Sequence, residues 1–273
     1  MTMRCTWIWI HGWGMSPEVW GGMESRMPEE RHRMFSYAKC GSVDQMRERL
    51  RLMIREETAP VRLIGWSLGG MLALEAALEP FECVEPGNGR NEADAEYTPH
   101  PIAQVLLIGA TLRFAGPDRT KSWPERVVRR MRAQLGVQRE ETRHRFAESM
   151  FSDEEREGRP EYPQWIARSR IPTDFSPEGL DAGLQYLLET DLTERWRHFA
   201  AVCLEDEGIS VRAVKRPDIV WMHGENDPIC PTGAIADIPD RGKILFRGAG
   251  HAPFMTEPDR FAEAVRRIVH EYR

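Results

Sequence analysis

Residues 61–78 read VRLIGWSLGGMLALEAAL, and this stretch decides how the rest of the chain is interpreted. The apolar run before the glycines is typical of a short strand, and the apolar run that begins at Gly70 is typical of a helix. Between them Ser67 lies in a G-x-S-x-G pattern. In that context the glycines allow a tight turn that presents the serine hydroxyl at the head of the helix. We therefore predict that Ser67 is a nucleophile at a strand-to-helix turn.

The whole chain has the composition of an ordinary globular protein. It has 273 residues, of which 41% are hydrophobic and 29% are charged, and its formal net charge is −6. No apolar run approaches the roughly 18 residues that a membrane span needs, so we expect no membrane partner. The acidic balance argues against a nucleic-acid partner. The five cysteines are scattered without a C-x-x-C pair, which favours reduced thiols and a cytoplasmic location over a disulfide framework or a zinc site.

Short β-branched or aromatic runs alternate with helical patterns along the chain. This alternation predicts an α/β fold, with a mostly parallel sheet flanked by helices on both faces. Reactive groups in such sheets lie on loops at the carboxyl ends of the strands. The expected strands are Thr6–Ile10, Val61–Ile64, Val105–Ile108, Ile219–Met222 and Lys243–Phe246, with Arg33–Tyr37 as a weaker sixth, and the expected helices are 43–56, 70–79 and 258–272.

Two segments interrupt the alternation. Residues 80–101 are polar, acidic and rich in turn-forming residues, which indicates a surface loop without a function of its own. Residues 116–205 carry helical patterns and no clear strand, so we expect an inserted helical cap over the carboxyl edge of the sheet. A four-residue repeat typical of one buried helix face is formed there by Trp123, Val127, Met131 and Leu135. The predicted organisation is a first part of the core over 1–115, the cap over 116–205 and a second part of the core over 206–273.

A serine hydroxyl needs a base to become a nucleophile, and the base needs a third group that holds its tautomer. In a sheet of this kind the three follow one another along the chain as Ser, then Asp or Glu, then His. Asp227 follows the fourth expected strand and His251 follows the fifth, so both lie past strand ends in the required order. We predict that His251 is the base and that Asp227 orients it. Glu225, on the same loop as Asp227, is the alternative acid.

The oxyanion that forms during attack on a carbonyl requires two donors. The first expected donor is the N–H of Leu68, which follows the nucleophile at the positive end of the helix. The second should come from the loop after an earlier strand. Residues 11–14 (HGWG) follow the first expected strand, which makes the N–H of Trp13 the candidate. We expect His11 to brace this loop rather than to carry a proton, because the base belongs later in the chain.

Three motifs resemble a known family. Residues 11–20 (HGWGMSPEVW), 65–70 (GWSLGG) and 250–254 (GHAPF) are together similar to the BioH-type α/β-hydrolases, the pimeloyl-[acyl-carrier protein] methyl ester carboxylesterases of biotin synthesis. The resemblance covers nearly the whole core and extends loosely into the cap through residues 184–192. It implies an α/β-hydrolase fold with an inserted cap. It also implies Ser67, His251 and Asp227 as the catalytic residues and Trp13 and Leu68 as the oxyanion hole.

The implied reaction is hydrolysis of a methyl ester through an acyl-enzyme, which needs no metal and no organic cofactor. Apolar walls for a medium-length acyl chain are expected from Trp13, Trp66 and Phe254, although each of these could equally belong to the core. Arg145 and Phe146 resemble an Arg-Phe pair in the cap of the family. We therefore expect Arg145 to contact a carrier protein and Phe146 to line the acyl channel.

A basic window distinguishes the expected cap from the rest of the chain. Residues 119–145 contain nine basic and three acidic residues, a charge of +6 against −12 for the remainder. Acyl-carrier proteins are strongly acidic, so the window is a candidate docking face for one. The alternative is a solvated helix face on which arginines cover apolar surface.

Other functions stay open on the sequence alone. We expect a monomeric esterase, but a general small-molecule carboxylesterase without a carrier-protein partner would have the same catalytic residues. A binding protein without catalysis and a carbon–carbon lyase on this fold are further alternatives.

Overall fold

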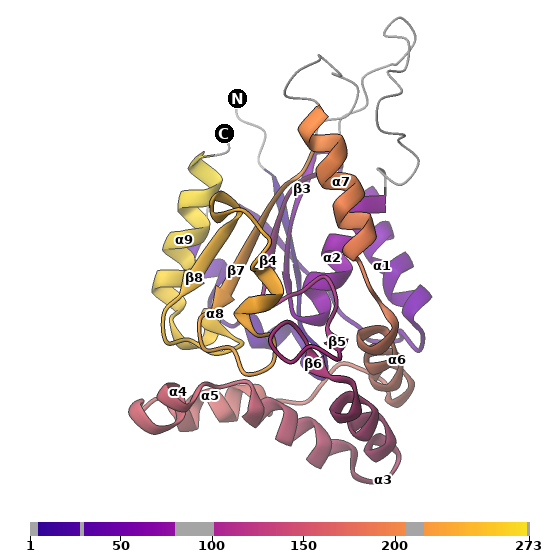
Figure 1. Cartoon of the computed structure of the whole chain (residues 1–273), viewed down its shortest axis with the longest axis vertical. Coiled ribbons are helices and arrows are strands. Elements are labelled where there is room, and N and C mark those ends of the chain that lie inside the picture. Colours follow the sequence, from indigo (N-terminus) through magenta and orange to yellow (C-terminus); the bar gives the residue numbers. More distant parts are fainter. Residues whose placement is uncertain (1–4, 28–29, 80–100, 206–215, 272–273) are drawn as a thin grey trace, which may run out of the picture.

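The computed structural model describes residues 5–27, 30–79, 101–205 and 216–271. Its centre is a sheet in the order β2-β1-β3-β4-β7-β8, in which every neighbouring pair of strands runs parallel. Helices cover both faces of the sheet (Figure 1). The parallel sheet flanked by helices that the sequence predicts is therefore confirmed. The strands are β1 (Thr6–Ile10), β2 (Arg31–Met34), β3 (Val61–Trp66), β4 (Ile102–Ile108), β7 (Asp218–Gly224) and β8 (Lys243–Phe246).

The inner strands are apolar because both of their faces are covered. Every residue of β1 is buried, and so is every residue of β3 and β4 except the second of each. The edge strand β2 is different, since its residues are exposed or half-buried. Two of its arginines, Arg31 and Arg33, form ion pairs with Glu57.

The weaker strand expected over Arg33–Tyr37 is shifted towards the N-terminus. Pairing with β1 ends where Met34 lies opposite Trp9. The N–H of Phe35 still donates to the carbonyl of Trp9 at 2.8 Å, and beyond this bond the chain leaves the sheet. Phe35 and Tyr37 are fully buried. The strand ends early because these aromatic side chains pack inward, with the Tyr37 ring stacked on Phe175 of the cap at 4.2 Å between centroids.

The helices predicted after β2, β3 and β8 are present with nearly the expected bounds. Helix α1 (Val43–Arg55) begins where the Ser42 hydroxyl accepts the N–H of Gln45, and it buries Met46, Leu50 and Ile54 at four-residue spacing. Most of α2 (Leu68–Leu78) is buried, because α2 lies between the sheet and its neighbouring helices. Helices α1 and α2 lie on one face of the sheet, and α9 (Pro258–Glu271) lies on the other (Figure 1). The expected last residue of this helix, Tyr272, lies outside the described residues.

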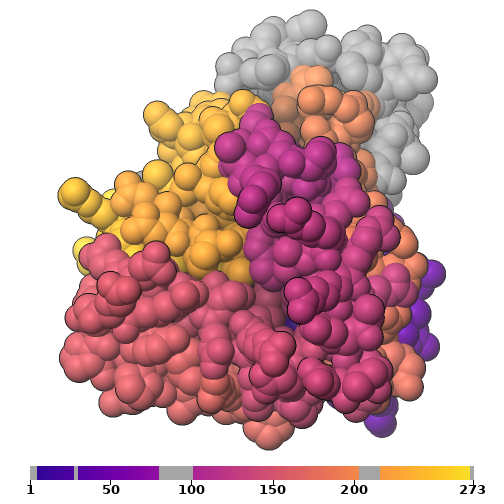
Figure 2. Space-filling model, turned by 60° about the horizontal axis from the view of Figure 1, so that its bottom comes forward, coloured from indigo at the N-terminus to yellow at the C-terminus, as the bar shows by residue number. Residues whose placement is uncertain are grey.

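Helices also extend across the carboxyl ends of the strands, where the sequence predicts a cap. In Figure 1 they lie below the sheet, and Figure 2, turned to show that side, has the segment from α3 to α5 covering much of the surface. These helices are α3 (Glu125–Ser149), α4 (Asp153–Gly158), α5 (Tyr162–Ser169) and α6 (Pro177–Glu189). The segment is not entirely helical, because the short strands β5 (Ala115–Gly116) and β6 (Trp123–Pro124) pair with each other before α3 begins.

Two expectations for this region need correction or refinement. Trp123 belongs to β6 and not to a helix face, because α3 begins only after Pro124, and Val128 is more deeply buried than Val127. Helix α7 (Thr193–Glu205) lies within the range expected for the cap, yet its Trp196 packs edge-on against Trp221 of β7 at 4.8 Å. We propose that the cap ends before α7.

Two further expectations concern the surface and the membrane. Apart from Pro101, the surface loop expected over 80–101 lies outside the described residues. Within the parts of the chain that the structure describes, no helix combines the length and the apolar character required to cross a membrane.

The turn after β3 provides a test of the fold. A Cβ on Gly69 would lie 2.3 Å from the carbonyl oxygen of Ile10, and neither backbone can yield without moving β1. We expect Gly69→Ala to lower the free energy of unfolding by at least about 2 kcal/mol in urea denaturation. Gly136→Ala in α3 is the control, because a Cβ there has no neighbour within 4 Å, and it should be neutral or stabilising. Equal stability of the two variants would contradict the close approach.

Candidate active site

Ser67 occupies the turn between β3 and α2 with a φ of 55° and a ψ of −117°. A positive φ is costly for a residue with a Cβ, so the surroundings must hold it in place. The Ser67 N–H donates to the carbonyl of Ile108 at 2.9 Å, and its own carbonyl accepts the N–H of Met71 at 3.0 Å. A Cβ at Gly65 would lie 2.5 Å from the carbonyl oxygen of Gly69, so only glycine fits there. The predicted nucleophile thus lies in a strained turn at the carboxyl edge of the sheet.

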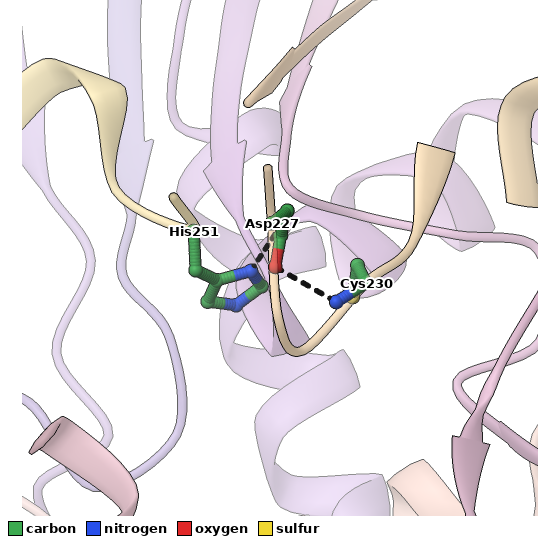
Figure 3. A group of neighbouring side chains, drawn as sticks. All are labelled: Asp227, Cys230 and His251. Carbon is green, nitrogen blue, oxygen red and sulfur yellow. Dashed lines mark hydrogen bonds and ion pairs between the residues drawn. The ribbon is translucent and has the colours of Figure 1, made fainter. Parts of the chain in front are cut away.

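His251 and Asp227 come from the loops after β8 and β7, and they form a buried pair (Figure 3). The distance between His251 Nδ1 and Asp227 Oδ2 is 2.7 Å, and both side chains are fully buried. Asp227 Oδ1 accepts the N–H groups of Ile229 and Cys230, each at 2.8 Å. Three donors therefore fix the orientation of the carboxylate. A hydrogen bond from Nδ1 leaves the lone pair of the neutral imidazole on Nε2.

The alternative acid, Glu225, does not approach His251. Its side chain is exposed, and its backbone N–H donates to the carbonyl of Phe246 at 2.9 Å. The structure therefore brings Asp227 to His251 and leaves Glu225 at the surface.

The loop of His251 lies against the turn of Ser67. The indole Nε1 of Trp66 donates to the carbonyl oxygen of His251 at 2.9 Å, and a Cβ on Gly109 would lie 2.8 Å from His251 Nδ1. Ser67 Oγ and His251 Nε2 are both buried, and neither has a hydrogen-bond partner within the described parts of the chain. The structure thus forms the bond between acid and base and leaves the bond between base and serine unformed. Such bonds often tighten only when substrate binds.

The two predicted oxyanion donors, the N–H groups of Leu68 and Trp13, lie on different elements: the start of α2 and the loop after β1. Leu68 is the first residue of α2, so its N–H has no acceptor within the helix. The loop after β1 is fastened to the cap: Trp13 Nε1 donates to the carbonyl of Leu180 in α6 at 2.8 Å. One residue further on, Gly14 has a φ of 72°, and its carbonyl accepts Arg143 Nη1 of α3 at 3.0 Å.

Arg143 is a buried cation whose polar groups are satisfied by the cap and the core together. It is 1% exposed, and its Nη1 also donates to the carbonyl of Ile171 at 3.0 Å. Its Nε and Nη2 bind the Glu140 carboxylate at 3.2 and 2.8 Å. The basic window predicted from the sequence includes Arg143 as a surface charge. For this residue the prediction is wrong, because its guanidinium faces inward, toward the loop of Trp13.

His11, which the sequence expects to brace the loop, lies between the core and the linker before α6. Its Nδ1 is 3.0 Å from the carbonyl of Gly12, and its Nε2 is 3.3 Å from Asp174 Oδ1. Burial tends to raise the pKa of Asp174, but the contact with His11 and its charge, together with bonds from Ser36 and Tyr37, outweigh it and lower that pKa. The contact agrees with a bracing role.

The residues predicted to line the acyl channel form two aromatic pairs. Trp66 and Phe254 meet edge-to-face at 5.1 Å between centroids, and Trp13 and Phe146 do so at 5.3 Å. All four rings are buried. Arg145 differs from them, because its side chain is 59% exposed and pairs with Glu141 on its own helix at 2.7 Å.

Asp227 is also supported by His223 and Cys230, for which the sequence predicts no role. His223 Nε2 lies 2.5 Å from the carbonyl oxygen of Cys230 and 3.6 Å from Asp227 Oδ2. Burial lowers the pKa of His223 more than the charge of Asp227 and the bond to Cys230 raise it, so the ring is neutral near pH 7. A histidine within the strand gave no signal of this role in the sequence.

The same group raises the question of a metal, because the ligand atoms of Asp227, Cys230 and His251 lie within 4.8 Å of one another. Both carboxylate oxygens already accept hydrogen bonds. Burial, and then the charge of Asp227, raise the pKa of the Cys230 thiol well above its ordinary value, which disfavours the thiolate that a metal would need. The arrangement fits an oriented imidazole better than a metal site.

The fold and this arrangement place the protein in a known class. The alpha/beta hydrolase family matches residues 7–264, and the chain belongs to that family.

Individual relatives carry a more specific name than the family does. A pimeloyl-[acyl-carrier protein] methyl ester esterase of Nitrosomonas europaea is 27% identical, over 93% of this chain and 91% of the relative. An esterase of the same name from Xanthomonas axonopodis is 28% identical, over 79% of this chain and 73% of its own. The similarity to this group that three motifs suggest is thereby confirmed.

Solved structures share the fold at lower identity. An esterase from Exiguobacterium antarcticum superposes with a TM-score of 0.68 at 20% identity, covering 97% of this chain and 92% of its own. A bromoperoxidase from Bacillus anthracis superposes with a TM-score of 0.69 at 15% identity, covering 98% and 92%. Their different names at similar scores show that the fold alone does not define the reaction.

Exchanging the acid tests which carboxylate orients His251. We expect Asp227→Asn to lower kcat/KM for p-nitrophenyl acetate by about 1,000-fold or more, because the amide can donate to Nδ1 and then favours the wrong tautomer. Glu225→Gln is the matched control and should retain the activity of the unaltered protein, since Glu225 is exposed. If Glu225→Gln caused the larger loss, the acid would have been assigned to the wrong residue.

Proposed function

We propose that this protein is a serine carboxylesterase in which Ser67 is the nucleophile, His251 the base and Asp227 the acid that orients it. One observation carries the proposal: the buried pair in which His251 Nδ1 lies 2.7 Å from Asp227 Oδ2. The pair lies against a turn that presents a serine at a positive φ. A buried imidazole with an oriented carboxylate on one nitrogen and an unpaired second nitrogen is suited to accept a hydroxyl proton.

In the first half of the proposed reaction, His251 Nε2 takes the proton of Ser67 as Oγ attacks the ester carbonyl. The developing oxyanion accepts the N–H groups of Leu68 and Trp13. The protonated imidazole then gives its proton to the departing alcohol, which leaves an acyl-serine. In the second half water loses a proton to His251 and attacks the acyl-serine, and Ser67 recovers its proton as the acid is released.

The rigid setting of the donors supports this chemistry, because oxyanion stabilisation depends on donors fixed before the reaction. Trp13 is held through its indole by the carbonyl of Leu180, and the carbonyl of the next residue, Gly14, accepts a bond from the buried guanidinium of Arg143. Leu68 is held by the helix that it begins.

As substrate we propose the methyl ester of a pimeloyl-acyl-carrier protein, with pimeloyl-acyl-carrier protein and methanol as products. Support comes from the names of the curated relatives and from the three motifs around Trp13, Ser67 and His251. The paired rings of Trp13 and Phe146 lie between the core and the cap, where an apolar acyl chain would find contacts.

The exposed side of the basic window is the proposed docking face for the acidic carrier protein. Arg126 and Arg130 of α3 are exposed, and within the described residues neither forms an ion pair. Arg145 pairs with Glu141 at the surface, an interaction that solvent screens and that a partner carboxylate can replace.

A second candidate, a general small-molecule carboxylesterase without a carrier partner, is favoured by a specific observation. Part of the basic charge is already neutralised within the chain, because Arg132 forms a bidentate pair with Asp181 at 2.6 and 2.8 Å. Arg143, buried against Glu140, offers no charge to a partner. The net attraction for an acidic protein is therefore smaller than the sequence charge alone suggests.

Removing the nucleophile tests the esterase itself. We expect Ser67→Ala to keep the stability of the unaltered protein and to lower kcat for p-nitrophenyl acetate by about 1,000-fold or more, because no other group can form the acyl intermediate. A fluorophosphonate probe should label the unaltered protein and not the variant. Turnover by Ser67→Ala close to that of the unaltered protein would rule out the proposed mechanism.

Reversing charge on the cap tests the carrier partner. We expect the triple variant Arg126→Glu, Arg130→Glu and Arg145→Glu to lower kcat/KM for methyl pimeloyl-carrier protein by more than about tenfold at low salt, because steering and orientation of the acidic partner are lost. Activity on p-nitrophenyl acetate should not change.

Arg241→Glu is the control. This exposed arginine lies just before β8 and therefore at the amino ends of the strands, opposite to the cap. An unchanged kcat/KM for the carrier substrate in the triple variant would reject docking on this face and favour the small-molecule esterase.

A further inference from the structure

The loop that carries His251 rests on the segment that leads into α4 of the cap. The backbone N–H of His251 donates to the carbonyl of Met150 at 2.8 Å. The Ser152 hydroxyl donates to the carbonyl of Gly248 at 2.9 Å. Two hydrogen bonds therefore join the base loop to the cap on either side of Gly250.

Ser152 and Glu155 are also bound to each other, as a reciprocal cap of α4. The Ser152 hydroxyl accepts the N–H of Glu155 at 3.1 Å, and Glu155 Oε2 accepts the N–H of Ser152 at 2.9 Å. Both side chains are buried, Glu155 at 4% exposure. The pair that starts this helix is thus the surface on which the base loop lies.

The fit between the two segments leaves no space for a side chain. A Cβ on Gly250 would lie 2.5 Å from the carbonyl oxygen of Met150, 2.6 Å from Glu155 Oε2 and 2.8 Å from the Ser152 nitrogen. Such distances mean that backbone meets backbone across this contact. Any change in the position of Ser152 or Glu155 must therefore shift the residue directly before His251.

The buried carboxyl of Glu155 is more than a helix cap needs. At the start of α1 the Ser42 hydroxyl accepts one N–H and the exposed side chain of Gln45 accepts that of Gly41. At the start of α6 the Ser176 hydroxyl accepts one N–H, so neither helix uses a buried carboxyl. Burial raises the pKa of Glu155 more than the amides of Gly250 and Ser152 and the hydroxyl of Thr256 lower it. Burying a carboxyl costs free energy, so the presence of Glu155 here indicates that its role is in the contact with the base loop.

We infer that Ser152 and Glu155 are positioning residues, which hold the base loop so that His251 stays aligned with Asp227 and Ser67. The inference rests on the proposed function of His251 as the base. A shift of about 1 Å in a catalytic group can cost on the order of 100-fold in rate, so a loop held from the cap affects kcat although the cap residues touch no reacting atom.

The test compares Glu155→Ala with Glu155→Gln and with Glu157→Ala, an exposed position on the same helix. For Glu155→Ala we expect a kcat for p-nitrophenyl acetate that is lower by about 10- to 100-fold, with KM changed by less than about twofold. Glu155→Gln should restore kcat to within about threefold, because its amide oxygen accepts the Ser152 N–H. Glu157→Ala should equal the unaltered protein.

A second readout does not depend on turnover. In proton NMR, the Nδ1 proton of His251 in its bond to Asp227 should give a low-field resonance, identified by its loss in Asp227→Asn. We expect this resonance to shift or broaden in Glu155→Ala and to return in Glu155→Gln. If the protein proved not to be an esterase, the resonance would still report whether the cap holds the base loop.

Two results would overturn the inference. One is a folded Glu155→Ala with unchanged kcat and an unchanged resonance. The other is a loss of kcat that Glu155→Gln fails to restore while the resonance stays in place. If Glu155→Ala did not fold, Ser152→Ala would carry the same test, since it removes the hydroxyl that binds Gly248.

Discussion

The structure depends on the close approach of backbone to backbone around the turn after β3. Gly69 lies where a Cβ would meet the carbonyl oxygen of Ile10, and Gly65 lies where one would meet the carbonyl oxygen of Gly69. This contact draws the start of α2 onto the end of β1. The amide of Leu68 and the loop of Trp13 are consequently brought to the same side of the sheet, which is the condition for two donors to act on one oxyanion.

Much of this arrangement could be predicted from the sequence, because its signals are local. A glycine-flanked serine between a strand and a helix, and polar residues directly after later strands, identify one edge of a parallel sheet. The choice between Asp227 and Glu225 lacked a decisive local signal. In the fold, burial and the two amides that reach Asp227 Oδ1 hold Asp227, and not Glu225, beside His251.

The contacts that the sequence did not reveal are those between the cap and the core. Arg143 appears in the sequence as one of several basic residues, yet it is buried because Gly14 and Ile171 offer carbonyls far away in the chain. Glu155 appears as one acid among several in a polar stretch, and only the folded structure brings Gly250 against it. Such pairings are set by tertiary packing, which periodicity and spacing do not encode.

The cap therefore does more than cover the sheet: α3 and α6 fasten the loop of Trp13, while the start of α4 supports the loop of His251. A designer who wished to change substrate preference by transplanting another helical cap would also replace these supports. A functional chimera would have to import or rebuild them together with the new lining, so the two parts cannot be exchanged as independent modules.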